Sequence, residues 1–174
     1  MDKAAATKLT AEVIADADAM LTKHGFERQK PFRAQGVLFH EWFCSLDWIT
    51  HVFKISYQLG YPERVHPTVS ARLDFPEGDH LGIDGTTVYY LIDQRDSLYG
   101  LKGIKGVLDR ASPERLRKRI LSEFEESLQW FAQYAEVKST LSRLRSAERN
   151  GAGVGTEPHA RAVAFLERLR DQKQ

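Results

Sequence analysis

The sequence contains a single cysteine, Cys44, so no disulfide can form within the chain. It has no continuous apolar run of the about 18 residues that a membrane-spanning helix needs. Its first ten residues, MDKAAATKLT, do not contain the apolar stretch of a secretory signal peptide. Because stable disulfides are typical of oxidising compartments, these absences favour a cytoplasmic protein that has no contact with a membrane.

A large net charge of either sign is also missing. The 25 Lys and Arg residues balance 24 Asp and Glu residues, which leaves a formal charge of +1. The molecule as a whole therefore has no strong electrostatic attraction for nucleic acid or for membrane surfaces. Hydrophobic residues make up 42% of the 174 residues, which is typical of a globular domain that forms its core without disulfides or metals.

Apolar residues recur at helical spacing near both ends of the chain. Residues 4–24 form the first helical pattern, and Gly25 follows as the expected residue just beyond the helix. A second pattern covers residues 112–149, starts with Ser-Pro-Glu as a typical helix N-terminus and has a break near residues 134–136. Residues 157–170 form the last helical pattern.

The residues between these helices have the composition and the alternation of β-strands. Residues 37–44 are rich in aromatic residues, and residues 51–59 alternate between two faces, so the two segments are predicted to form a hairpin through residues 47–50. Residues 68–75 and 86–92 are predicted to be two more strands, because proline and glycine residues separate them from their neighbours.

Strands that follow one another without intervening helices favour an antiparallel sheet. We therefore predict an α+β fold with an N-terminal helix, an antiparallel sheet of about four to five strands, and C-terminal helices packed on the sheet. Residues 1–149 are predicted to form one domain. The glycine-rich residues 150–156 are predicted to be a flexible linker, and residues 157–174 a C-terminal helix packed on the domain.

The stretch FHEWFC contains His40, Glu41 and Cys44, which are all potential metal ligands. A zinc ion needs its ligands within about 2.3 Å, but in a strand His40 and Cys44 lie roughly 13 Å apart and Glu41 points to the other face. We predict a strand in which Cys44 is a small buried apolar group. A reactive pair of Cys44 with His51 or His66 stays open as an enzyme hypothesis.

No cofactor or metal site is predicted. The sequence GAGVG at residues 151–155 follows a helical pattern and lacks the Lys-Ser/Thr pair of a phosphate-binding loop. The acid-rich residues 74–84 do not have the spacing of an EF-hand loop. No combination of residues in the sequence matches a known catalytic motif.

An acidic segment lies in the middle of the chain: residues 61–100 contain seven acids and three bases. Such a segment can steer a basic protein partner. A tryptophan that faces solvent would anchor the interface, although core packing is the alternative for that residue. The predicted partner-binding residues are Asp74, Glu77, Asp79, Asp84, Asp93, Asp96 and Trp48.

A basic segment follows: residues 101–120 contain seven bases and two acids. Positive charge near the start of a helix opposes the helix dipole, so the cluster has no evident role in helix stability and could bind nucleic-acid phosphates. A solvated helix face is the alternative. The candidate nucleic-acid-binding residues are Lys102, Lys105, Arg110, Arg115, Arg117, Lys118 and Arg119.

Three segments of the chain resemble one protein family. The segments HGFERQKPFRAQG (24–36), LFHEWFCSLDWITHVFKISYQLG (38–60) and LQWFAQYAEVKSTLSRL (128–144) are similar to the opening, the hairpin and the C-terminal helix of the bacterial domain-of-unknown-function family four-three-zero-four. The resemblance covers about residues 5–147. It implies a small α+β protein of the immunity type found in toxin systems, and it supplies no catalytic residues.

We therefore expect a protein-binding module, immunity or inhibitor-like, that neutralises or assists a protein partner such as a toxin or effector without catalysis. The alternative is a nucleic-acid-associated accessory protein that uses the basic residues 102–119. An enzyme based on Cys44 is the third hypothesis. The sequence carries no signal for an oligomeric state.

Overall fold

The computed structural model contains helices on one side of an antiparallel sheet. It describes residues 3–58, 61–74, 89–95, 113–149 and 157–172. The elements, in chain order, are α1 (Lys3–Lys23), β1 (Glu27–Arg28), β2 (Phe32–Ala34), β3 (Val37–Ser45), β4 (Ile49–Gln58), β5 (Tyr61–Asp74), β6 (Tyr89–Arg95), α3 (Pro113–Ala132), α4 (Val137–Arg149) and α5 (Glu157–Gln172).

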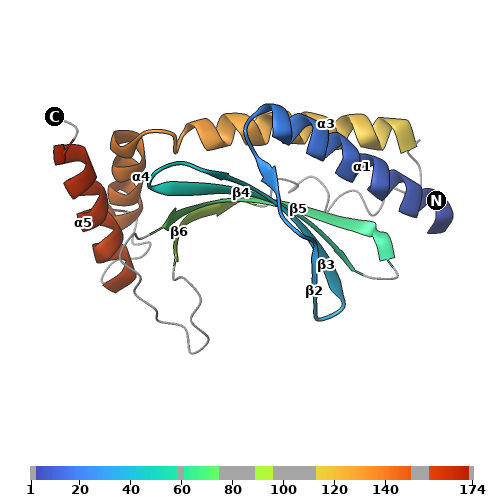
Figure 1. Ribbon diagram of the computed structural model, residues 1–174, viewed down its shortest axis with the longest axis horizontal. Coiled ribbons are helices and arrows are strands. Elements are labelled where there is room, and N and C mark those ends of the chain that lie inside the picture. Colours follow the sequence, from blue (N-terminus) through green and yellow to red (C-terminus); the bar gives the residue numbers. More distant parts are fainter. Residues whose placement is uncertain (1–2, 59–60, 75–88, 96–112, 150–156, 173–174) are drawn as a thin grey trace.

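The six strands form one sheet in the order β1-β3-β4-β5-β6, and β2 pairs with β3 beside β1. Every pairing is antiparallel. Helices α1 and α3 lie along one face of the sheet, and α4 and α5 stand at one end (Figure 1). The predicted α+β fold, with an N-terminal helix, an antiparallel sheet and C-terminal helices, is confirmed.

Helix α1 ends as its sequence predicts. Gly25 has a φ of 80°, a conformation that costs side-chain-bearing residues energy. The Phe26 N–H donates to the Leu21 carbonyl over 3.0 Å, and the Gly25 N–H donates to the Thr22 carbonyl over 3.1 Å. These are the two hydrogen bonds of a Schellman motif. The motif turns the chain so that Phe26 enters the core, where it is 4% exposed.

The predicted β3–β4 hairpin is present, but its turn lies earlier than expected. Ser45 pairs with Thr50, and the Leu46 N–H donates to the Ile49 carbonyl over 2.8 Å. The turn therefore consists of residues 46–48, and β4 begins at Ile49. This turn fixes which residues of β3 lie opposite which residues of β4.

The prediction that prolines separate β4 from β5 was wrong. Strand β5 begins at Tyr61 and contains Pro62 and Pro67, and Pro67 pairs with Ile55 of β4. Strand β6 pairs with β5 only from Val69 onward, so among the described strands the proline-containing half of β5 has an open edge. Proline has no backbone N–H. Where that group would point to an open edge, no hydrogen bond to a neighbouring strand is lost. Strand β6 continues past the predicted end at residue 92 to Arg95, and the predicted residues 86–88 are outside the described part.

The short strands β1 and β2 were not predicted. Ala34 of β2 pairs with Val37 of β3, and the two residues between them, Gln35 and Gly36, have φ values of 49° and 76°. Two successive residues with positive φ define the type I′ turn that joins tightly paired strands. The β2–β3 hairpin extends away from the helical layer (Figure 1).

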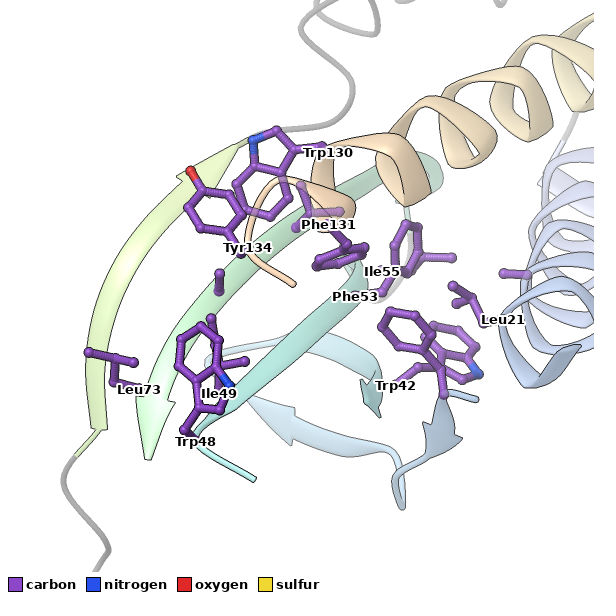
Figure 2. Close-up of a cluster of buried hydrophobic side chains, with 14 of the residues drawn as sticks. Leu21, Trp42, Trp48, Ile49, Phe53, Ile55, Leu73, Trp130, Phe131 and Tyr134 are labelled. Atoms are coloured by element: carbon purple, nitrogen blue, oxygen red, sulfur yellow. The ribbon is translucent and has the colours of Figure 1, made fainter. Parts of the chain in front are cut away.

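The break in the C-terminal helical pattern is confirmed: α3 ends at Ala132 and α4 begins at Val137. Around this break Trp130, Phe131 and Tyr134 are buried, and their rings gather over the sheet (Figure 2). Helix α5 packs on α4. The predicted linker at residues 150–156 lies outside the described residues.

Candidate functional site

The two faces of β3 have different surroundings because side chains alternate along a strand. His40 and Trp42 face α1 and are buried, with Trp42 completely so. The Trp42 indole N–H donates to the Asp18 carboxylate of α1 over 2.8 Å. Phe39 and Phe43 lie on the opposite face. Strand β3 therefore separates a pocket beneath α1 from an outer surface.

The pocket lies between α1 and the sheet, with a volume of about 390 Å³. Its apolar side is formed by Ala11, Ile14 and neighbouring residues of α1. The sheet contributes Arg28, His40 and Tyr57. The pocket is about half open to solvent, and an apolar hollow with a few polar groups at one side has the general character of a small-molecule site.

Several neighbours hold Arg28 in place at this pocket. Its Nη2 donates to Nδ1 of His40 over 3.3 Å. Its Nη1 lies 3.7 Å from a carboxylate oxygen of Asp18. Its guanidinium carbon is 5.6 Å from the centroid of the Trp42 ring, a cation–π contact. The guanidinium therefore has three partners beside the pocket, while 38% of the side chain remains exposed.

His40 is neutral in this arrangement. Burial lowers the pKa of His40, and the charge of Arg28 lowers it further. Because a guanidinium only donates hydrogen bonds, Nδ1 must accept and the hydrogen resides on Nε2. That nitrogen is buried and has no hydrogen-bond partner among the described residues, which costs about 1–3 kcal/mol. The ring stacks on Tyr57 at 5.9 Å.

The outer surface combines aromatic rings with long cations. Phe32 of β2 stacks on Phe39, with 4.9 Å between ring centroids and 13° between planes. Lys54 lies 5.9 Å from the Phe39 ring and Arg72 lies 4.7 Å from the Phe43 ring. The faces of Phe39 and Phe43 are thus partly covered by the protein itself. Phe32 is the exception: it is 46% exposed.

Glu41 lies on the outer surface directly opposite Lys54. Burial raises the pKa of the Glu41 carboxyl, and the charges of Lys54 and Arg72 oppose this shift. The carboxylate is therefore part of a mixed-charge group. The outer surface does not have the uniformly positive charge that tracks a nucleic-acid backbone.

The structure places Cys44 and His51 directly opposite each other on β3 and β4. Burial raises the pKa of the Cys44 thiol, whereas a reactive cysteine needs a lowered one. Burial also lowers the pKa of His51, against a hydrogen bond to the Tyr134 backbone that raises it. The His51 ring stacks on Phe131 at 4.9 Å. The pair is close, but its surroundings favour a thiol rather than a thiolate.

The acidic residues predicted to bind a partner are only partly described. Asp74 ends β5, and Asp93 of β6 pairs with Ala71. Trp48 is 5% exposed and belongs to the core. Its predicted role as a surface anchor was wrong, because the β3–β4 turn directs the side chain inward. The other four predicted acids lie outside the described residues, namely Glu77, Asp79, Asp84 and Asp96.

The basic cluster loses one of its predicted members. The Arg117 guanidinium donates to both carboxylate oxygens of Asp16 and also reaches Glu12. Arg117 therefore ties α3 to α1 rather than offering a free charge to phosphate, which corrects its predicted role. Lys118 is exposed. The remaining predicted bases are outside the described residues or belong to α3 with undescribed side chains, namely Lys102, Lys105, Arg110, Arg115 and Arg119.

Two absences apply to the described part of the chain. It contains no group of three or more His, Cys, Asp or Glu side chains that could hold a metal ion. None of its helices combines the length and the apolar character needed to cross a bilayer.

Comparisons with models of known protein families, with curated proteins and with solved structures find no match. The resemblance to the domain-of-unknown-function family four-three-zero-four therefore stays a prediction.

Sequence reasoning missed both Arg28 and Phe32. They lie in the segment ERQKPFRA, residues 27–34, where three bases surround one phenylalanine. This mixture of a proline, bases and an isolated aromatic residue is typical of an edge strand. This pattern can be read from the sequence. The ion pair between Arg28 and Asp18 of α1 cannot, because the two residues come together only in the fold.

Because burial raises the pKa of Cys44, we expect iodoacetamide at pH 7.5 to alkylate the folded protein more slowly than it alkylates glutathione. The rate in urea-unfolded protein is the internal control and should be faster. Mass spectrometry over time measures both rates. Faster alkylation of the folded protein than of glutathione would revive the cysteine-enzyme hypothesis.

We expect the fold to become less stable in acid because of two buried histidines. The pKa values of His40 and His51 are lowered, so below about pH 6.5 the unfolded chain binds protons that the folded chain does not. The free energy of unfolding should therefore decrease as pH falls below 6.5, by at most about 1.4 kcal/mol per pH unit for each histidine. Urea denaturation of His51→Phe should show a shallower pH dependence.

Proposed function

We propose that the chain is a protein-binding module, inhibitor-like and without catalysis, that uses the edge of the β2–β3 hairpin to dock a protein partner. One observation carries the proposal: Phe32 is 46% exposed, yet its ring is held by stacking on Phe39. Such a ring can bind a partner at a low entropic cost, because its side chain loses little conformational freedom when the partner buries it. Fixed aromatic side chains of this kind are typical of interface cores.

The charge around Phe32 defines the chemistry of the partner. Residues 27–34 contain three bases and one acid. Lys30 and Arg33 are exposed and flank Phe32 in the sequence, and Arg33, which pairs with Leu38, lies on the other face of β2 from Phe32. The complementary surface is an apolar pocket with an acidic rim. We call Lys30, Phe32 and Arg33 the Phe32 edge.

The mode of docking is by side chains rather than by strand addition. Strand β2 has only three residues. It pairs with β3 alone among the described strands, but Pro31 precedes it and has no N–H to donate to an added strand. The partner would therefore cover Phe32 without extending the sheet.

In this proposal the acidic residues of the predicted partner-binding set contribute to partner binding separately from the Phe32 edge. Asp74 and Asp93 lie on β5 and β6, away from β2 in the strand order. A partner that is a toxin or effector of the cytoplasm would fit the predicted compartment. The resemblance to an immunity-type family supports the same class of function.

The partner can be identified by photocrosslinking from this surface. A benzoylphenylalanine at Ala34, an exposed residue of β2, should capture one protein that a benzoylphenylalanine at Leu46 does not. Leu46 is also an exposed apolar residue, at 40%, but it lies at the other end of β3. The captured protein is then purified for affinity measurements.

With the purified partner, calorimetry should show that Phe32→Ala weakens binding about tenfold or more, as expected for a buried aromatic anchor. Arg33→Glu should slow association and reduce its dependence on salt. Leu46→Ala is the matched control and should bind as the wild type does. The proposal is wrong if Ala34 captures no stoichiometric partner or if Phe32→Ala leaves the affinity unchanged.

A further inference from the structure

We infer that the pocket between α1 and the sheet binds a small monocarboxylate with an apolar body. This site is on the helical side of the sheet and is independent of the Phe32 edge. Its volume of about 390 Å³ lies in the range of natural small-molecule sites.

The α1 side of the pocket provides the apolar surface. Ala11 and Ala15 line it and are themselves exposed, and Ile14 lies between them. Small alanine side chains leave room between the helix and the sheet. Tyr57 of β4 faces them across the pocket, so an aliphatic chain or a ring would have apolar contact on two sides.

The sheet side provides the anion-binding group. Asp18, His40 and the Trp42 ring all contact the Arg28 guanidinium and favour this orientation. A planar guanidinium that is already held in place pairs well with a planar carboxylate, because few rotamers are lost on binding. Tyr57 also lines the pocket, and its hydroxyl is a second donor for the same carboxylate.

His40 is a positioning residue. Its neutral Nδ1 accepts a hydrogen bond from Arg28 without cancelling the positive charge, whereas an acid in this place would neutralise the guanidinium. The charge of Arg28 is partly balanced by Asp18. The site therefore suits a ligand with one negative charge better than a phosphate with two.

The test uses the full chain and four probes: octanoate, benzoate, the neutral octanamide and inorganic phosphate. Calorimetry should detect saturable binding of octanoate or benzoate. Octanamide should bind about tenfold more weakly than octanoate, because it cannot form a charge-assisted hydrogen bond with Arg28. Binding of phosphate alone, or no saturable binding of either carboxylate, would overturn the inference.

Substitutions test whether the carboxylate binds in this pocket. Arg28→Gln should weaken carboxylate binding about tenfold or more, and Ala11→Phe should abolish it by filling the pocket. Arg33→Gln removes the same charge from β2, outside the pocket, and is the control that should bind normally. Because Ala11 is exposed, Ala11→Phe should retain the fold and decides the question even if Arg28→Gln unfolds. Undiminished binding to Ala11→Phe would contradict the assigned site.

Discussion

The structure depends on the burial of Trp42 beneath α1. The side chain is completely buried, its ring meets Phe53 edge-on at 6.0 Å, and its N–H is satisfied by Asp18. An indole N–H in a core without an acceptor would be costly, so α1 can pack only where Asp18 reaches it. This single constraint sets the position of α1 over the sheet, beside Leu21 and Phe53 in the core (Figure 2).

The same constraint defines both proposed surfaces. With Trp42 facing α1, the alternation of β3 places His40 under the helix, where it orients Arg28 at the pocket. The alternation also turns Phe39 to the outer side, where it supports Phe32. The pocket and the Phe32 edge are thus two consequences of one strand, although each would act without the other.

Local patterns were sufficient to predict most of the fold. The alternation in β4, Gly25 after α1 and the break between α3 and α4 each depend on neighbouring residues. Features that depend on distant residues were not predictable. The prolines of β5 are tolerated because β6 pairs only with the other half of the strand. Arg117 pairs with Asp16 across 101 positions, and Trp48 turned out to be buried.

A double-mutant cycle tests the central role of Trp42 most directly. The variants are Trp42→Phe, which keeps a ring and removes the N–H, Asp18→Ala, and the double variant. Urea denaturation should give a coupling free energy of about 1.5 kcal/mol, as expected for a hydrogen bond to a charged group. Effects that add within about 0.5 kcal/mol would show that the two side chains do not interact, and would contradict the account.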